Sequence, residues 1–132
     1  MAGELILIVE DNEKNLKLVR DILQFKGYRT VEAETAEDGI TLAQSHQPNL
    51  ILMDIQLPGA DGVTALRQLR TEPRTASIPV IALTAFAMKN DRQRFLDAGF
   101  DGYIDKPINV KEFPEQVRRF CEAGRRSDLE GL

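Results

Sequence analysis

The apolar run Leu50–Met53 ends abruptly at Asp54, and a loop marked by Pro58 and Gly59 follows. A short apolar run between turn signals is typical of a strand buried on both faces, as the central strands of parallel sheets are. Asp54 would then lie at the carboxyl end of that strand, where open α/β sheets place their ligand sites. Because a buried charge is costly unless it is paired or binds a metal, Asp54 is either a turn-capping residue or a functional carboxylate.

Four other segments have the composition of strands. Leu5–Val9 and Pro79–Leu83 are continuous apolar runs, whereas Tyr28–Ala33 is interrupted by polar residues and Gly102–Ile104 is short. Helical patterns separate the five strands, and this alternation predicts one parallel sheet with helices on both faces. If the most apolar strands are central and the polar or short strands are edges, the strand order is 2-1-3-4-5. The expected fold is therefore α/β, doubly wound and flavodoxin-like, with five helices.

Start and stop signals bound the helices. Gly27 predicts the end of the first helix, and Thr35 predicts the start of the second. The fourth helix is expected over Ala87–Ala98, and Met88 and Phe95 are among its few apolar residues. Because little packing energy holds it, we expect it to be the most mobile helix.

The last helix is expected to place five residues at core spacing: Val110, Phe113, Val117, Phe120 and Cys121. Asn109 and Glu112 have the spacing of a capping box, which puts Pro114 beyond the turn whose N–H groups are free. Either regular hydrogen bonding begins a residue or two later, or the first turn is bent.

The 132 residues predict one domain over residues 1–123 and a polar tail over residues 124–132. The net charge of −4 gives no whole-molecule reason to expect a nucleic-acid or membrane partner. Cys121 is the one cysteine, which excludes a disulfide framework and a thiol metal cluster. The first apolar run is too short for a signal peptide or a membrane span, so we expect a cytoplasmic protein.

The predicted strand order brings three carboxylates together, because the strand before Glu10 and Asp11 lies beside the strand that ends at Asp54. Neighbouring strands are about 4.8 Å apart. Two like charges about 4 Å apart repel by about 4 kcal/mol at an effective dielectric of about 20, so a cation must offset them. Lys106 ends the fifth strand and Thr84 ends the fourth, so both side chains should lie at the same end of the sheet as the three carboxylates. An oxygen-only acidic cluster suits Mg²⁺, and the whole set has the parts for phosphoryl transfer to aspartate.

Several short motifs occur together in this order: Val9–Asn12, Met53–Pro58, Gly62, Thr84–Ala85 and Lys106–Pro107. On these motifs, the chain from about Leu5 to Ala123 resembles the receiver domains of two-component response regulators, which share the CheY-like fold. Met53–Pro58 and Leu83–Met88 are most similar to the DivK-like single-domain regulators.

The resemblance implies that Asp54 accepts a phosphoryl group from the phosphohistidine of a histidine kinase or phosphotransfer protein, or from a small phosphodonor. Asp11 and Asp54, with the backbone carbonyl of Gln56, would ligate Mg²⁺, with Mn²⁺ as an alternative. Glu10 would act on the metal through water. Many members have aspartate at the position of Glu10, and the longer side chain changes only this indirect contact.

The resemblance also implies how the signal leaves the site. Lys106 would contact a phosphoryl oxygen, and Thr84 would move towards the phosphoryl group as Tyr103 turns inward. Gln56 and Phe86 would control the access of water to the phosphoaspartate, whose hydrolysis we expect to be slow. The alternative is that Phe86 only packs under the fourth helix.

Two further expectations concern one peptide bond and the surface that would bind a downstream protein. The peptide bond before Pro107 should be cis, which would turn Lys106 into the crevice. A downstream protein should bind the face built by the fourth helix, the strand of Tyr103 and the last helix. The chain would then be no enzyme, apart from its own phosphorylation and dephosphorylation.

Alternative functions make demands that these residues do not meet. A haloacid-dehalogenase-type aspartyl phosphatase needs an acid two residues after the nucleophile, where this chain has Gln56. A flavodoxin-like cofactor binder needs a Gly/Ser/Thr-rich loop, whereas Glu10–Glu13 would repel phosphate. We expect no DNA-binding output after Ala123. A receiver excised from a longer regulator or hybrid kinase remains an open alternative.

Overall fold

Five short strands form one parallel sheet in the computed structural model, which describes residues 3–57, 62–85 and 89–124. The strands are β1 (Leu5–Val9), β2 (Arg29–Ala33), β3 (Leu50–Asp54), β4 (Val80–Thr84) and β5 (Gly102–Asp105). All four pairings between neighbours are parallel, and the order is β2-β1-β3-β4-β5. The predicted fold class and strand order are therefore confirmed.

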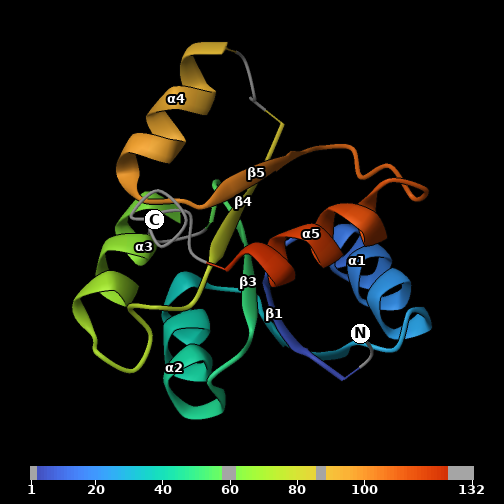
Figure 1. The fold of residues 1–132 in the computed structure, drawn as a ribbon, viewed down its shortest axis with the longest axis horizontal. Coiled ribbons are helices and arrows are strands. Elements are labelled where there is room, and N and C mark those ends of the chain that lie inside the picture. The colour runs from blue at the N-terminus through green and yellow to red at the C-terminus, as the bar shows by residue number, and fades with distance from the viewer. Residues whose placement is uncertain (1–2, 58–61, 86–88, 125–132) are drawn as a thin grey trace.

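Within the described ranges, five helices cover both faces of the sheet (Figure 1). They are α1 (Glu13–Phe25), α2 (Ala36–His46), α3 (Gly62–Thr71), α4 (Lys89–Ala98) and α5 (Phe113–Ala123). Side chains of α1 and α5 pack with Ile8 and Leu52 of the central strands, whereas those of α2, α3 and α4 pack with Val9 and Met53. Successive strand residues point to opposite faces, so a strand covered on both sides needs an apolar residue at every position.

The burial of the strands follows their predicted places in the sheet. Every residue of β3 and β4 is buried, and in β1 four of the five are. In β2, at an edge, Ala33 alone is buried. The apolar runs therefore identified the central strands correctly, because only these strands are covered on both faces.

Local signals set the ends of the first two helices. The side-chain oxygen of Asn12 accepts a hydrogen bond from the N–H of Asn15 at 3.0 Å and caps α1. Gly27 follows the end of α1 with a φ of 91°, a backbone conformation that favours glycine. The hydroxyl of Thr35 caps α2 by accepting from the N–H of Asp38 at 3.1 Å. The predicted end of the first helix and start of the second are confirmed.

The start of α5 differs from the capping-box prediction. The side chain of Asn109 accepts from the N–H groups of Lys111 and Glu112, at 3.0 and 3.1 Å, but this closes a turn that precedes the helix. Regular helix begins at Phe113, so Pro114 lies in the first turn, where its missing N–H costs nothing. Val110 falls in the turn and is 57% exposed, so its prediction as a core residue is wrong.

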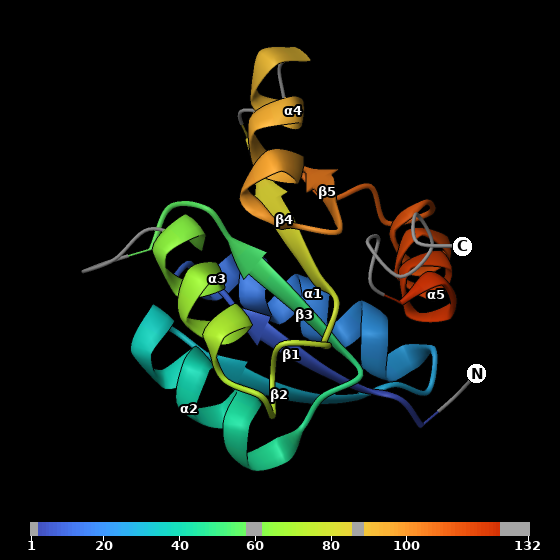
Figure 2. The ribbon, with the colours of Figure 1, turned by 60° about the vertical axis from the view of Figure 1, so that its left-hand side comes forward.

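α4 projects from the carboxyl edge of the sheet in both ribbon views (Figure 2). Among the side chains of α4 that the structure describes, Phe95 is the buried one, and its ring packs edge-on against Phe100 with centroids 6.1 Å apart. The predicted first residues of this helix, Ala87 and Met88, lie outside the described residues. Few anchors hold α4, and its greater mobility stays a prediction.

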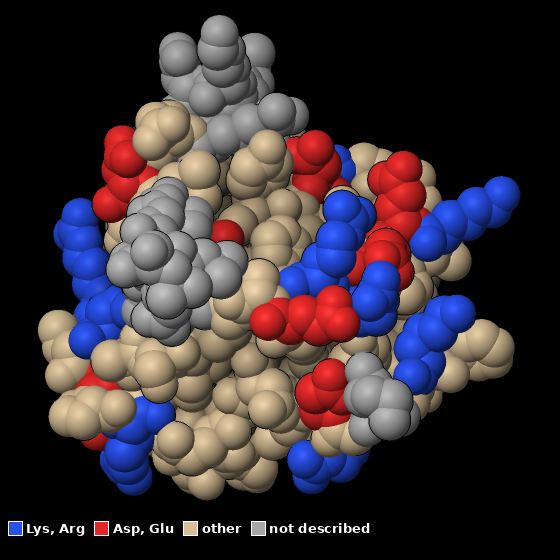
Figure 3. All heavy atoms as spheres, in the orientation of Figure 1, with Lys and Arg blue, Asp and Glu red and all other residues tan. Residues whose placement is uncertain are grey.

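The described surface mixes charges of both signs. On the face shown in Figure 3, acidic and basic side chains are interspersed, most plainly on the right of the view, over α5. Among the residues drawn in colour there, no extended cationic stripe appears of the kind that a phosphate backbone would need. Within the described ranges, no helix combines the length and the apolar character that crossing a membrane requires.

Candidate functional site

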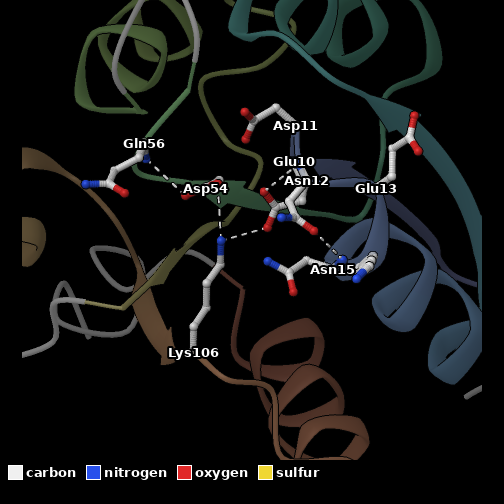
Figure 4. Close-up of a pocket in the computed structure, with 9 residues that line it drawn as sticks. Glu10, Asp11, Asn12, Glu13, Asn15, Asp54, Gln56 and Lys106 are labelled. Atoms are coloured by element: carbon white, nitrogen blue, oxygen red, sulfur yellow. Dashed lines mark hydrogen bonds and ion pairs between the residues drawn. The ribbon is translucent and has the colours of Figure 1, made fainter.

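The carboxyl ends of β1 and β3 bring three carboxylates into one crevice (Figure 4). Val9 pairs with Met53, so the next residues, Glu10 and Asp54, lie side by side. One carboxylate oxygen each from Glu10, Asp11 and Asp54 can be chosen so that all lie within 4.8 Å of one another. Glu10 and Asp54 are buried and Asp11 is exposed, so the cluster opens to solvent on one side. The predicted convergence of these three residues is present in the structure.

Lys106 reaches the same crevice from the end of β5. Its N–H donates to the carbonyl of Thr84 at 2.8 Å, which joins the loop after β5 to the end of β4. Its Nζ lies 2.7 Å from Glu10 Oε1 and 3.1 Å from Asp54 Oδ2. The peptide bond between Lys106 and Pro107 is cis, the isomer expected from the resemblance. One ammonium group therefore pairs with two buried carboxylates.

Burial and mutual contact shift the ionisation of these groups. Burial raises the pKa of Glu10 from its ordinary value of 4.5 to about 7, and the nearby Asp54 carboxyl adds to this rise. Burial alone would lower the pKa of Lys106, but its contacts with Glu10 and Asp54 outweigh this effect and raise the pKa. Lys106 thus stays cationic, while Glu10 holds a proton more readily than an exposed carboxyl does.

Backbone groups hold two of the carboxylates in place. The N–H of Gln56 donates to Asp54 Oδ1 at 3.0 Å, and the N–H of Asn12 donates to Glu10 Oε2 at 3.3 Å. Figure 4 shows the Gln56 side chain directed away from Asp54. Each acceptor is thereby fixed by the loop that follows its own strand.

Gly62 supports the loop after β3 in a way that the strand pattern did not predict. Its N–H donates to the carbonyl of Ile55 at 3.0 Å. A Cβ at this position would lie 2.9 Å from the carbonyl oxygen of Asp54 and 3.1 Å from Ile55 Cα. Both of these are backbone atoms, so a side chain here would push the first turn of α3 away from the end of β3.

The oxygen donors suit a hard divalent cation. Three carboxylates from two neighbouring strands, without a cysteine or histidine among the residues that line the crevice, are the ligand chemistry that Mg²⁺ prefers. The crevice has a volume of about 790 Å³. Lys14 and Asn15, which the sequence did not single out, also line it. Both lie in the first turn of α1, three and four residues after Asp11. This closeness in the sequence is the signal that could have identified them as crevice residues.

The two predicted switch residues lie on neighbouring strands. Thr84 is buried at the end of β4, where its carbonyl accepts from the N–H of Lys106, but it is not among the described residues that line the crevice. Tyr103 of β5 pairs with Ala82 of β4, is half-buried, and packs against the core cluster that contains Phe95. Phe86, the second residue predicted to control water, lies outside the described residues.

Comparison with known proteins gives one consistent family. A family model described as the response regulator receiver domain matches residues 6–118. The chain is 44% identical over 115 residues to the polar-differentiation response regulator DivK of Brucella ovis and of Brucella abortus. Each match covers 87% of this chain and 94% of the relative.

Solved structures have the same fold. The receiver domain of a sensor histidine kinase from Pseudomonas aeruginosa, described with a magnesium ion coordinated in its active-site cleft, is 35% identical with a TM-score of 0.83. That match covers 92% of this chain and 99% of the other. A CheY-like receiver domain protein from Methanospirillum hungatei is 30% identical with a TM-score of 0.82, covering 92% of this chain and 96% of the other.

Proposed function

Because this chain belongs to the response regulator receiver family, we propose that Asp54 is its phosphoacceptor in two-component signalling. The observation that carries this proposal is the convergence of the Glu10, Asp11 and Asp54 carboxylates with the Lys106 ammonium group at one end of the sheet. This arrangement offers a nucleophile, ligands for a cation and a fixed positive charge, which phosphoryl transfer requires.

The transfer step is a displacement at phosphorus. An Asp54 carboxylate oxygen attacks the phosphorus of a phosphohistidine, a new O–P bond forms, and the N–P bond breaks with its electron pair going to the histidine nitrogen. The donor is a histidine kinase or a histidine phosphotransfer protein, and a small phosphodonor can replace it. Lys106, which lies 3.1 Å from Asp54 Oδ2, is close enough to pair with an oxygen of the incoming group.

A divalent cation belongs to the proposal. Asp11 and Asp54, with the backbone carbonyl of Gln56, would hold Mg²⁺ or Mn²⁺, and Glu10 would act on it through water. The bound ion would neutralise charge on the phosphoryl oxygens. The oxygen-only donor set supports this assignment, as does the magnesium ion in the cleft of the receiver domain from Pseudomonas aeruginosa.

The output is a change in protein binding. A phosphoryl group on Asp54 would give the hydroxyl of Thr84 a new partner, and Tyr103 would fill the space behind it. Tyr103 lies in β5, and Thr84 pairs with Asp105 of the same strand. The changed surface would therefore be the face built by α4, β5 and α5. We propose residues 1–123 as the receiver unit and residues 124–132 as a tail outside it. Gln56 and Phe86 would limit the access of water to the phosphoaspartate.

Phosphorylation by acetyl phosphate tests the assignment. With Mg²⁺, the chain should gain about 80 Da, the mass of one phosphoryl group on a carboxylate. Asp54→Asn should gain none, and Asp11→Asn should need far more Mg²⁺ for the same extent of modification. Mass spectrometry of the intact chain measures all three. Equal modification of Asp54→Asn would overturn the proposal.

A second setting is supported by a different observation, because the Pseudomonas aeruginosa match is a domain of a sensor histidine kinase. In that setting this chain would be a receiver within a longer regulator or hybrid kinase. Phosphotransfer profiling separates the two settings. A free-standing regulator should accept phosphate rapidly from a separate kinase, whereas a hybrid-kinase receiver should prefer the kinase module of its own chain.

A further inference from the structure

The opening of the acidic crevice carries a lysine that the transfer step described above does not use. Lys14 lies in the first turn of α1 and lines the crevice together with Lys106. Lys14 is exposed, whereas the side chain of Lys106 is 16% exposed. The crevice thus has one cation in its interior and another where a donor would enter. Without Lys14, the exposed carboxylates of Asp11 and Glu13 at this opening would repel an anion.

Lys14 differs from the other cations of α1 because its ammonium group is not engaged. Lys17 pairs with Asp21 at 2.7 Å. Arg20 pairs with Glu32 at 3.2 Å. Among the residues that the structure describes, none forms a hydrogen bond or an ion pair with the Lys14 ammonium group. An anion that approaches Lys14 therefore has no protein carboxylate to displace.

The backbone that carries Lys14 is held by the loop before α1. The N–H of Asn12 donates to Glu10 Oε2 at 3.3 Å, and Asn12 Oδ1 accepts from the N–H of Asn15 at 3.0 Å. The same Glu10 carboxylate pairs with Lys106. The first turn of α1 is therefore tied to the interior of the crevice, and only the side chain of Lys14 has to be ordered when it meets an anion.

We propose that Lys14 is a specificity-determining residue that favours acyl phosphates among the small phosphodonors. This role rests on the proposed function of Asp54 and adds to it the class of small donor. When an Asp54 oxygen attacks an acyl phosphate, an O–P bond forms. The bond between phosphorus and the acyl oxygen breaks, and its electron pair leaves on a carboxylate anion.

The position of Lys14 suits this leaving group. The attacking and leaving atoms of a phosphoryl transfer lie roughly in line. Because Asp54 is buried and attacks from inside the crevice, the leaving group departs towards the opening. The Lys14 ammonium group there would offset the negative charge that develops on the acyl oxygen, an interaction that strengthens in the transition state.

A donor with a neutral leaving group gains less from Lys14. In phosphoramidate the nitrogen is protonated as –NH₃⁺, the N–P bond breaks with its electron pair going to nitrogen, and neutral ammonia departs. Both donors transfer the same phosphoryl group, so the contact of Lys106 with that group is common to them. Lys14 faces the part in which the two donors differ, and it should therefore separate the two classes.

Phosphorylation rates with the two donors test this role. The phosphorylated fraction of wild type and Lys14→Met is followed with Mg²⁺ by mass spectrometry of the intact chain, using acetyl phosphate or phosphoramidate. Lys14→Met should lower the ratio of the acetyl phosphate rate to the phosphoramidate rate about fivefold, the effect of a unit charge about 4 Å away in water. Carbamoyl phosphate, a second acyl phosphate, should follow acetyl phosphate. The difference should shrink in about 1 M salt, where charges are screened within about 3 Å.

Two matched variants keep the outcome specific. Lys14→Arg keeps the charge and should retain the wild-type ratio. Lys17→Met removes the same charge at an exposed lysine of α1 that does not line the crevice, and it should retain the ratio as well. An unchanged ratio in Lys14→Met, an equal fall in Lys17→Met, or a similar fall in Lys14→Arg would overturn the role of Lys14. None of these results touches the proposed function, which fails only if Asp54→Asn is modified as the wild type is or if neither donor modifies the wild type. Either of those two results would overturn the role of Lys14 too.

Discussion

Burial and neighbouring charged groups strongly affect the ionisation of Glu10, one of the carboxylates of the crevice. Its side chain is buried, its Oε1 lies 2.7 Å from Lys106 Nζ, and its pKa is raised to about 7, first by burial and then by Asp54. In the absence of a metal, Glu10, Asp54 and Lys106 together carry a net charge of −1 when both carboxyls are ionised. A proton on Glu10 or a divalent cation in the crevice relieves that charge, so protons and metal compete for the same place.

The pH dependence of stability should reveal the protonation of Glu10 in metal-free buffer. Its folded-state pKa of about 7 lies above the ordinary value of 4.5, so the folded state holds the proton more tightly than the unfolded state. Its contribution to stability is therefore fully present below pH 4.5 and is lost as the pH rises through 7. The slope attributable to Glu10 is at most about 1.4 kcal/mol per pH unit.

Urea unfolding with EDTA, at several pH values, measures this contribution. The difference between wild type and Glu10→Gln should shift in favour of Glu10→Gln as the pH rises from 4.5 to 7. Groups that do not interact with Glu10 titrate alike in both proteins and cancel in this difference. Parallel stability curves for the two proteins would show that Glu10 titrates normally.

Replacement of Gly62 should affect both stability and phosphorylation. Gly62→Ala should lower the free energy of unfolding by about 1–3 kcal/mol, the usual result of forcing a methyl group into packed atoms. The strain falls on the carbonyl of Asp54, so phosphorylation by acetyl phosphate should slow as well. Gln68→Ala, at an exposed position of α3, is the control and should leave both measurements nearly unchanged. A Gly62→Ala chain of wild-type stability would mean that α3 shifts without resistance.

At the scale of elements, one arginine ties α3 to the segment between α4 and β5. Arg70 donates to three carbonyls beyond its own helix, those of Ala76, Ile78 and Gly99. It also pairs with Asp101, whose side chain is 2% exposed. The same carboxylate accepts from the N–H of Val80 at 2.9 Å, at the start of β4. The beginnings of β4 and β5 are thereby joined to α3 at the end of the sheet opposite the crevice.

Removal of this arginine should be costly. Arg70→Met should lower the free energy of unfolding by about 3–5 kcal/mol, because it takes the cation from a buried carboxylate. Arg74→Met removes an arginine that pairs with Glu72 at the surface and should cost about 0–1 kcal/mol. Chemical denaturation of both variants measures the contrast. A similar small loss in the two proteins would show that Arg70 is dispensable.

At the scale of the whole molecule, α4 has a fixed end and a weakly held body. Its carboxyl end is tied through Gly99 to Arg70, whereas Phe95 is the buried side chain among those described. An element held in this way can change position at a small cost in packing energy. Under the proposed function, an effect of phosphorylation at Asp54 would reach α4 through β4 and β5.

Hydrogen exchange followed by mass spectrometry tests this behaviour. Amides of α4 should exchange faster than those of α1, and phosphorylation should change exchange in α4 and β5 but not in α2. Thr84→Ala should still become phosphorylated, but phosphorylation should no longer change exchange in α4 and β5. The reason is that this variant lacks the hydroxyl that would contact the phosphoryl group. Unaltered exchange in α4 after full phosphorylation of the wild type would contradict the proposed route.

Polarity along the chain was enough to predict the sheet and the meeting of three carboxylates at one of its ends. Continuous apolar runs identify strands covered on both faces, and polar or short strands identify edges, so the strand order follows from polarity along the chain. That order sets the carboxyl ends of β1 and β3 side by side, and Glu10, Asp11 and Asp54 meet there for that reason. Capping residues such as Thr35 can also be predicted from the sequence, because their hydrogen bonds are made within one helical turn.

Contacts between side chains of distant segments could not be predicted from local patterns in the chain. The pairing of Lys106 with Glu10 and the raised pKa of Glu10 depend on burial at the junction of three strands. The tie between Arg70 and Asp101 joins residues 31 positions apart, and no local pattern marks it. Val110 has the spacing of a core residue but lies in a turn, because α5 begins three residues later. Periodicity reports which residues share a face, whereas the folded chain decides what covers that face.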